Sequence, residues 1–329
     1  MLRVGLLGAG RIGRIHGANV AAHPRARLMA VADPSAEMGG SAASSSGAEL
    51  RDVEAVVAGE DVDAVLICTP TDSHAELIER AARAGKAVFC EKPVSLDAER
   101  TRACLAVVQA CGTPLMVGFN RRFDPSFAAV RWRILAGEIG AVELVTILSR
   151  DPSPPPLDYV ARSGGLFRDM MIHDLDMARF LLGEEPVEVH AVASCLIDPR
   201  IGEAGDVDTA AVMLRTASGR IAQISNSRRA TYGYDQRVEV HGSRGLLAVG
   251  NQRATSVAFA DAQGTRTDPA LPFFLERYAD AYRAEIGAFI TGVLEGRPLS
   301  PSGEDGLRAQ LLADAATLAV GTGQAVRLP

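Results

Sequence analysis

Three side chains, from two distant segments of the sequence, carry groups that could move a proton and stabilise an oxyanion. Lys92 lies in Cys-Glu-Lys-Pro at the end of an apolar run, where Pro93 removes a backbone donor and constrains the chain. An ammonium group there can stabilise the alkoxide that forms as a hydride leaves a carbinol carbon. Asp169 and His173 are four residues apart in a predicted helix and therefore share one face. A carboxylate one turn from an imidazole can fix its tautomer, which suits His173 to act as a general base.

The helix that carries this pair is otherwise strongly apolar, and Asp176 falls on the same stripe as Asp169 and His173. Polar groups on a buried helix cost free energy unless they are paired, so we expect the stripe to line a wet cleft. Two plainer interpretations remain open, in which Asp169 only caps the helix and Asp174 or Asp176 is only solvated. Adjacent helical positions such as 173 and 174 point about 100° apart, which disfavours a metal site here. The sequence therefore predicts no metal.

The N-terminal segment has the pattern of a nucleotide cradle. An apolar strand at 2–7 runs into Gly-Ala-Gly-Arg-Ile-Gly at 8–13, and a helical stretch follows. In this pattern Gly8 permits a tight turn, Gly10 lets the backbone approach a pyrophosphate, and Gly13 allows the helix to pack closely on the strand. The N-terminus of the helix adds N–H groups and a positive dipole for the phosphates.

An acidic residue after the second predicted strand supports the same interpretation. Asp33 ends the strand at 28–32, twenty residues beyond the last glycine of the loop. A carboxylate at this place accepts hydrogen bonds from a ribose 2′-hydroxyl and repels a 2′-phosphate, so Asp33 favours NAD over NADP. The alternative is that Asp33 merely forms a turn before Pro34, which the surrounding pattern makes the weaker interpretation.

Further candidates follow the third and fourth predicted strands. Carboxyl ends of parallel strands meet at the edge of the sheet where ligands bind, so we expect Thr69 and Pro70 to line the path of the ribose and nicotinamide. His74 begins the next helix, and we assign it no chemistry. The predicted cofactor contacts are Gly8, Gly10, Arg11, Ile12, Gly13, Asp33, Thr69, Pro70, Glu91 and Lys92.

The order of predicted elements changes near residue 120. Strands and helices alternate over 1–120, which is typical of a parallel, doubly wound sheet, although the small residues at 41–47 predict a loop. Consecutive strands joined by tight turns follow in 121–329, and two helices end the chain. We therefore predict an α/β protein with an N-terminal Rossmann domain and a C-terminal α+β domain for substrate binding and oligomerisation. The second domain contains a large, mostly antiparallel open sheet, and its last helices could pack back on the first domain.

Composition excludes several classes of protein. The chain has 329 residues, 47% of them hydrophobic, and a net charge of −6, which excludes disorder and a basic surface for nucleic acid. The sequence shows neither a membrane span nor a signal peptide. Its five cysteines lack metal-binding spacing and are expected to be reduced thiols. We expect a cytoplasmic enzyme that binds neither nucleic acid nor membranes.

The glycine loop, Glu91-Lys92-Pro93 and the pair Asp169 and His173 together resemble the glucose–fructose oxidoreductase/inositol dehydrogenase family. Within it, segments 119–124, 149–152, 169–179 and 274–278 resemble the inositol 2-dehydrogenase branch. The resemblance spans nearly the whole chain. It implies NAD-dependent oxidation of a cyclitol hydroxyl, most simply of myo-inositol to 2-keto-myo-inositol (scyllo-inosose). Another cyclitol or an aldose, such as scyllo-inositol or glucose, is the alternative substrate. A non-catalytic, nucleotide-sensing regulator is disfavoured because both the lysine and the histidine are present.

The same resemblance implies roles for particular residues. Lys92, Asp169 and His173 would form the catalytic trio, and the Lys92–Pro93 peptide bond would be cis. The implied contacts to the polyol are Lys92, Arg122, Asp151, Asp169, His173 and Tyr232.

The resemblance also implies a homotetramer, and the sequence supports an assembly. Two of the predicted strands of the second domain are apolar on one face, with Val189, Ala191 and Ala193 in one and Val207, Thr209 and Ala211 in the other. A sheet face that the helices leave uncovered needs a partner, and closed symmetry is the usual solution.

Overall fold

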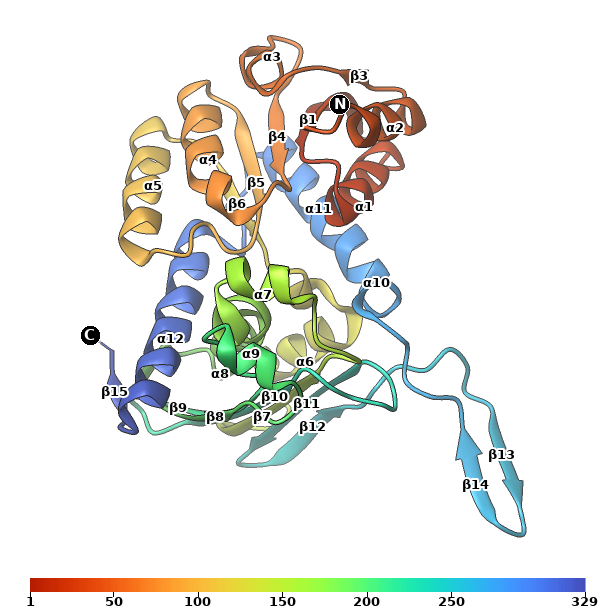
Figure 1. Ribbon diagram of the computed structural model, residues 1–329, viewed down its shortest axis with the longest axis vertical. Coiled ribbons are helices and arrows are strands. Elements are labelled where there is room, and N and C mark those ends of the chain that lie inside the picture. The colour runs from red at the N-terminus through yellow and green to blue at the C-terminus, as the bar shows by residue number, and fades with distance from the viewer. Residues whose placement is uncertain (329) are drawn as a thin grey trace. The chain divides into compact units, whose positions relative to one another are not determined.

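The computed structural model describes residues 1–328, which fall into two compact units (Figure 1). The first unit comprises Met1–Phe123 and Ala281–Gln310. The second comprises Asp124–Asp280 and the residues from Leu311 onward. The chain thus returns to the first unit near its end before it completes the second.

The first unit is built on a six-stranded parallel sheet with the strand order β3-β2-β1-β4-β5-β6. Parallel strands that are covered on both faces need apolar residues at every position. The apolar run of β4 meets this need, since all four of its residues are buried. From β1 the strand order runs through β2 and β3 to one edge of the sheet, and through β4 and β5 to β6 at the other edge. The point between β1 and β4, where this order switches, is a topological switch point at the carboxyl ends of the strands. The strands are β1 (Leu2–Leu7), β2 (Ala26–Ala32), β3 (Glu49–Leu50), β4 (Ala64–Ile67), β5 (Ala87–Glu91) and β6 (Leu115–Gly118).

Helices surround this sheet and complete its core. Ile286, Phe289 and Ile290 of α11 belong to the same buried apolar cluster as Leu6 and Phe89 of the sheet. The helices are α1 (Arg11–Ala21), α2 (Ala36–Ser46), α3 (Val53–Ala58), α4 (His74–Arg83), α5 (Ala98–Cys111) and most of α11 (Ala279–Glu295), with 3-10 turns at Thr71–Ser73 and Asn120–Phe123. The Rossmann fold expected from the sequence is confirmed.

The predicted loop at 41–47 was wrong, since these residues form the end of α2 and its cap. Ser35 caps the helix by accepting a hydrogen bond from the Met38 backbone N–H. Gly47, in the left-handed region at φ 67°, ends it. The small residues of this segment can form a helix because Ser35 caps its N-terminus and Gly47 caps its C-terminus.

The second unit contains a seven-stranded sheet with the order β12-β11-β7-β10-β9-β8-β15. The pairing of β7 with β10 is parallel and the other pairings are antiparallel, so the expected mostly antiparallel open sheet is confirmed. A separate hairpin of β13 and β14 extends away from this sheet (Figure 1), and the sequence did not predict it. The strands are β7 (Val142–Arg150), β8 (Pro186–Ser194), β9 (Thr209–Thr216), β10 (Ile221–Ser227), β11 (Asp235–Gly242), β12 (Gly245–Val249), β13 (Ala258–Asp261), β14 (Gly264–Thr267) and β15 (Val326–Arg327).

Helix α8 packs on the covered face of this sheet, against β7 and β10. The sequence predicted one α-helix from residue 169, but residues Phe167–Met171 form a π-helical segment that leads into α8 (Ile172–Leu182). Short π-helical segments are rare and often occur at functional sites. The other helices are α6 (Pro125–Leu135), α7 (Leu157–Ser163), α9 (Pro199–Glu203), α10 (Phe274–Arg277) and the later part of α12 (Gly303–Thr322).

The open face of the sheet differs in part from the sequence prediction. In β9 the expected residue Ala211 is exposed, as is its neighbour on that face, Met213. In β8 the prediction was wrong, because Val189 pairs with the buried Leu214 and so lies on the covered face. Ala191 and Ala193 share that face with it, and Val192 is exposed instead. A shift of one residue moves every side chain of a strand to the other face, and alternation along a strand of mostly small apolar residues cannot reveal it.

A buried ion pair in the second unit gives a test of this fold. Arg277 and Asp124 are each 1% exposed and in contact, and the Arg277 guanidinium lies 5.3 Å from the centre of the Phe127 ring. Replacing Arg277 with Met should lower the free energy of unfolding by about 3–5 kcal/mol, because it leaves a carboxylate buried without its partner.

The matched control removes an exposed arginine from the same unit. Arg162 pairs with Asp158 at 3.3 Å, but both side chains are more than 70% exposed. Arg162→Met should therefore change the free energy of unfolding by less than about 0.5 kcal/mol. Urea denaturation followed by circular dichroism measures both values, and similar losses in the two variants would contradict the prediction.

Candidate active site

The glycine loop after β1 has the geometry of a dinucleotide cradle. Gly8 has φ 92°, and a Cβ there would lie 2.6 Å from the Cys68 backbone oxygen. A Cβ on Gly13 would lie 1.9 Å from the Gly8 oxygen, so the start of α1 can approach β1 only without a side chain. A Cβ on Gly10, in contrast, would meet no atom of the described residues within 4 Å. No contact in the described part of the chain therefore requires glycine at position 10, whereas close approach of a pyrophosphate to this backbone would require it.

Asp33, at the carboxyl end of β2, is joined to this loop by hydrogen bonds. Its Oδ2 accepts from the Ala9 backbone N–H at 2.6 Å, and its Oδ1 accepts from Ser35 N–H at 2.8 Å. Sequence reasoning assigned Asp33 to the ribose and missed this second role as an anchor of the loop. The residues present thus fit NAD: a backbone cradle for phosphates and a carboxylate beside it for a ribose hydroxyl.

Two further loops at the same edge of the sheet are linked by a buried histidine. His74 is 2% exposed, and its ring nitrogens lie 2.7 Å from the Pro93 oxygen and 2.8 Å from the Thr69 oxygen. Burial lowers the pKa of His74, although these hydrogen bonds act in the opposite direction. The ring therefore ties the Thr69–Pro70 loop to the loop that carries Lys92, a structural role for which the sequence gave no signal. The Lys92–Pro93 peptide bond is cis, as expected.

In the second unit, Asp169 projects from the π-helical segment rather than capping a helix. Its Oδ1 accepts a hydrogen bond of 2.9 Å from the Tyr159 hydroxyl on α7. Partial burial and the negative charge of Asp169 raise the pKa of Tyr159, so the phenol remains a donor at neutral pH. His173 follows in the first turn of α8 and is half-buried. The sequence correctly placed Asp169 and His173 in one helical region, but it predicted neither the π-helical turn nor the tyrosine.

A buried arginine completes the surroundings of Asp169. Arg228 is 1% exposed, and its Nη1 lies 3.9 Å from Asp169 Oδ2. Its Nη2 lies 3.6 Å from Asp206 Oδ2. A guanidinium at this place helps to hold the Asp169 carboxyl group in position by electrostatic attraction. Sequence reasoning missed Arg228, and the available signal was a pair of arginines directly after the strand β10.

Asp174 and Asp176 are buried structural residues and are not solvated, which answers one alternative left open by the sequence. Asp174 accepts hydrogen bonds from Ser149 Oγ at 2.6 Å and Asn226 Nδ2 at 2.8 Å, and so fastens α8 to β7 and β10. Asp176 is 1% exposed and lies 3.4 Å from Arg179. Asp176 lies one turn beyond His173 in α8 but is buried, so the expected open stripe does not extend to it.

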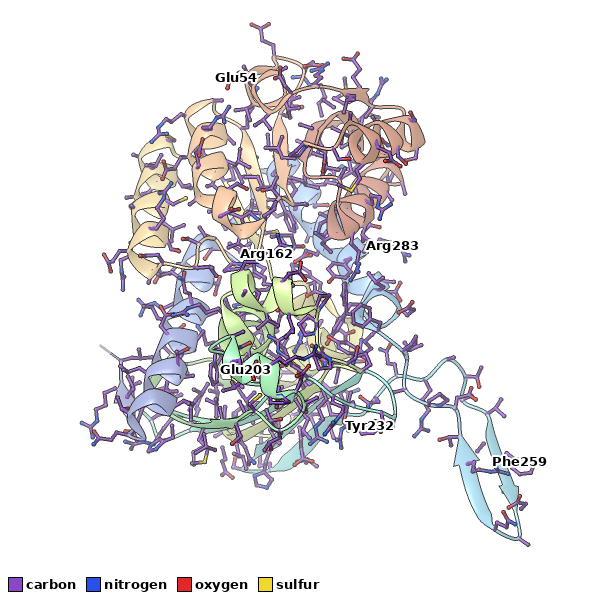
Figure 2. The ribbon with its side chains drawn as sticks, viewed as in Figure 1. Glu54, Arg162, Glu203, Tyr232, Phe259 and Arg283 are labelled. Atoms are coloured by element: carbon purple, nitrogen blue, oxygen red, sulfur yellow. The ribbon has the colours of Figure 1, made fainter. Side chains whose placement is uncertain are left out.

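The remaining polyol candidates are held by polar partners. Arg122 donates to Asp305 at 2.9 Å within the first unit. Tyr232, which is labelled in Figure 2, donates to Asp235 at 2.7 Å and accepts from Arg150 at 3.0 Å. Its exposed fraction is 48%. Asp151 directly follows β7. Of the candidate catalytic and substrate residues, Lys92 and Arg122 belong to the first unit, and Asp151, Asp169, His173 and Tyr232 belong to the second.

Two family models match the chain, one for each part of it. Residues 2–119 match a model described as "Oxidoreductase family, NAD-binding Rossmann fold". Residues 127–248 match the GFO/IDH/MocA C-terminal domain. The chain belongs to the GFO/IDH/MocA family of oxidoreductases. This confirms the family resemblance and the NAD cofactor expected from the sequence.

Relatives in this family match over almost their whole length. Inositol 2-dehydrogenase of Rhizobium meliloti (strain 1021) is 60% identical over 319 residues, which is 97% of each chain. Myo-inositol 2-dehydrogenase of Thermotoga maritima is 45% identical over 99% of this chain and 98% of its own. Scyllo-inositol 2-dehydrogenase (NAD(+)) of Bacillus subtilis is 38% identical over 90% of this chain and 87% of its own.

Solved structures similar to this chain have the same fold. A putative myo-inositol dehydrogenase from Sinorhizobium meliloti 1021 has a TM-score of 0.98 at 58% identity and covers 100% of both chains. Scyllo-inositol dehydrogenase from Lactobacillus casei, solved with bound NAD(H) and scyllo-inositol, has a TM-score of 0.92 at 31% identity over 99% of both chains.

Asp33 allows a prediction about the cofactor. Asp33→Ser should lower kcat/KM for NAD by about tenfold or more, because charge-assisted hydrogen bonds to the ribose and to the glycine loop are lost. The ratio of NADP to NAD efficiency should rise, since a 2′-phosphate would no longer face a carboxylate.

The control for this change is Ser35→Ala. This variant removes the cap of α2 next to Asp33 but leaves the carboxylate in place. The NADP-to-NAD ratio should stay as it is in the unmodified protein. Initial rates at varied cofactor concentration measure both variants, and equal use of NAD and NADP by the unmodified enzyme would contradict the assignment.

Proposed function

We propose that this protein is an NAD-dependent cyclitol dehydrogenase that oxidises myo-inositol to 2-keto-myo-inositol. The observation that carries the proposal is the position of Lys92, directly after β5 at the edge of the sheet that also bears the glycine loop. Loops at the carboxyl ends of parallel strands are where such sheets bind ligands. The choice of an inositol is supported by relatives named for inositol at 60% and 45% identity.

The chemistry assigned to each residue follows from its surroundings. We propose that His173 takes the proton of the hydroxyl being oxidised and that Asp169 orients the imidazole. Tyr159 and Arg228 keep Asp169 in place, since Tyr159 donates a hydrogen bond to it and Arg228 is a nearby cation. The ammonium of Lys92 stabilises the oxyanion that develops on the carbinol oxygen. When bound, NAD supplies the hydride acceptor.

Scyllo-inositol is the second candidate substrate. One relative is named for this cyclitol, and one similar structure was solved with it. The two inositols differ only in the orientation of one hydroxyl, so one set of hydrogen-bonding residues could accept either. Arg122, Asp151 and Tyr232 are proposed to contact the other ring hydroxyls.

The catalytic assignment predicts two kinetic effects. Lys92→Ala and His173→Ala should each lower kcat by a factor of about 10²–10⁴ while NAD binding changes little, because their interactions strengthen mainly in the transition state. Loss of His173 should also abolish the acidic limb of the pH profile, since only the neutral imidazole accepts a proton.

Steady-state rates across pH, with NAD binding measured by fluorescence titration, test this assignment. Lys86→Ala is a suitable control, because Lys86 binds the Gly59 and Val62 oxygens at 2.8 Å and has no proposed part in the reaction. Near-normal turnover in either catalytic variant would refute that residue's role.

The substrate proposal predicts an order of activity. A pocket that hydrogen-bonds every hydroxyl of an uncharged ring should reject analogues lacking one, by up to about 10⁴-fold. We expect myo-inositol to be a good substrate, glucose a weaker one and 2-hydroxy acids inert. A screen that follows NADH absorbance decides this, and faster turnover of lactate or a sugar phosphate than of any cyclitol would overturn the proposal.

We further propose that the protein is a cytoplasmic homotetramer, assembled as a dimer of dimers through the open sheets. An interface on the open face is supported by three exposed apolar side chains there, those of Val192, Met213 and Leu246. A partner subunit would remove these side chains from water. Reduced thiols are typical of the cytosol, and burial raises the pKa of Cys68 and Cys90. Within residues 1–328, no helix is long and apolar enough to cross a membrane.

The assembly is tested by one substitution on that face. Met213→Glu places a charge in the proposed interface and should convert the tetramer into smaller species at micromolar concentration. Phe259→Glu is the control, because Phe259 is also exposed but lies on the β13–β14 hairpin (Figure 2). Light scattering measures both, and a monomeric unmodified protein would reject the proposal.

A further inference from the structure

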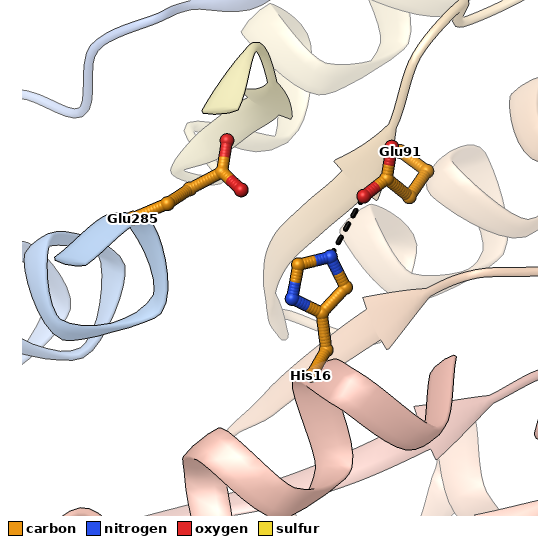
Figure 3. A group of neighbouring side chains, drawn as sticks. All are labelled: His16, Glu91 and Glu285. Atoms are coloured by element: carbon orange, nitrogen blue, oxygen red, sulfur yellow. Dashed lines mark hydrogen bonds and ion pairs between the residues drawn. The ribbon is translucent and has the colours of Figure 1, made fainter. Parts of the chain in front are cut away.

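Three titratable side chains meet in the interior of the first unit (Figure 3). His16 comes from α1, Glu91 from the end of β5 and Glu285 from α11. His16 and Glu285 are fully buried, and the Glu91 side chain is 13% exposed. Glu91 immediately precedes Lys92, so whatever holds Glu91 also constrains the backbone of the proposed catalytic lysine.

The contacts within this trio are unequal. His16 Nε2 lies 2.7 Å from Glu91 Oε1, whereas neither carboxyl oxygen of Glu285 has a hydrogen-bond partner among residues 1–328. The Glu285 carboxyl nevertheless faces the other two side chains (Figure 3). One nitrogen of His16 and one carboxyl oxygen each of Glu91 and Glu285 lie within 4.8 Å of one another. A small change in side-chain torsion would bring Glu285 into hydrogen-bonding contact.

The distances do not suit a metal ion. Two ligand atoms that each lie about 2.0–2.1 Å from a tetrahedral zinc ion are separated by about 3.3 Å. The contact between His16 and Glu91 is 2.7 Å, which is a hydrogen bond and too short for two ligands of one ion. His16 and Glu91 therefore act on each other.

The surroundings of Glu285 favour its neutral form. The ring of His16 packs edge-on against Phe89 at 5.0 Å and Tyr282 at 5.6 Å, and Ile286 and Phe289 are fully buried nearby on α11. A carboxylate in such a place costs several kcal/mol unless a cation pairs with it. Burial and the charge of Glu91 both raise the pKa of Glu285 well above its ordinary value.

Glu91 has little room to move. It pairs with Gly118 of β6, and a Cβ on that glycine would lie 3.1 Å from the Glu91 carboxylate. The carboxylate is thus held between a neighbouring strand, His16 and Glu285. A second negative charge on Glu285 would repel it from this position.

We propose that Glu285 is a positioning residue that stays protonated and shares its proton with the His16–Glu91 pair, which fixes Glu91 and, through it, Lys92. The proposal rests on the role of Lys92 in the proposed function. The titratable groups that face the trio are Tyr282 of α11 and Cys68 at the end of β4, and Lys92 follows in sequence. Burial raises the pKa of the Cys68 thiol, so Cys68 stays neutral.

The raised pKa has a defined consequence for stability. The unfolded carboxyl loses its proton near pH 4.3, while the folded one keeps it. The contribution of the protonated Glu285 carboxyl to the stability of the fold is therefore complete below that pH. It is lost as the pH rises towards the pKa of Glu285 in the folded protein. Within that window the unfolding equilibrium constant of the unmodified protein should rise about tenfold per pH unit relative to that of Glu285→Gln, which cannot titrate.

Three variants test the proposal. Glu285→Gln keeps a neutral hydrogen-bond donor, whereas Glu285→Met keeps the volume without it. Gln310→Met is the control for loss of a buried polar group, because Gln310 accepts a hydrogen bond from Thr101 and lies outside the trio. Glu285→Met should lower kcat about tenfold with little change in KM for NAD. Glu285→Gln should restore most of this activity, and Gln310→Met should leave kcat close to normal.

Direct evidence for the proton comes from infrared spectroscopy. The C=O stretching band of a protonated carboxyl should be present at neutral pH and absent from Glu285→Gln. The proposal is overturned by a pH dependence of unfolding that is the same in both proteins, by unchanged kcat in Glu285→Met, or by stoichiometric metal that is lost in Glu285→Gln. The band and the unfolding slope do not depend on turnover, so they remain decisive if Lys92→Ala shows that Lys92 has no catalytic role.

Discussion

The close approach of α1 to β1 is the constraint on which the first unit depends. The helix can start where it does only because a side chain at Gly13 would collide with the Gly8 oxygen. This contact turns the N–H groups of the loop and the helix dipole towards one edge of the sheet. Asp33 then holds the loop through Ala9, and the ends of β4 and β5 reach the same edge. Cofactor recognition thus follows from one steric requirement and the parallel direction of the strands.

Buried polar groups fix the remaining parts of the site. His74 joins the Thr69 and Lys92 loops through two backbone oxygens, and His16 contacts Glu91, the residue before Lys92, at 2.7 Å. In the second unit, the π-helical segment places Asp169 within reach of Tyr159 and Arg228. Such groups are costly to bury unless they are paired, so each one specifies a single arrangement of the backbone around a reactive side chain.

Much of this could be predicted from the sequence because the signals are local. The glycine spacing, the acidic residue after the second strand and the alternation of apolar runs with helices identify the Rossmann sheet and its cofactor. The motif around Lys92 and the spacing of Asp169 and His173 identify candidates for chemistry. The open face of the second sheet was harder, because strand β8 has small apolar residues in succession and its register is set by pairing with β9.

The sequence by itself determined the family and the cofactor loop and supplied the candidates for the reactive groups, since each depends on residue type and short spacing. Only the tertiary structure decided which partners those groups have. Arg228 lies 59 residues beyond Asp169, and Glu285 lies 194 residues beyond Glu91. The π-helical segment that carries Asp169 was likewise not predicted by the sequence. Contacts between distant segments depend on packing, and no local pattern of residues encodes that packing.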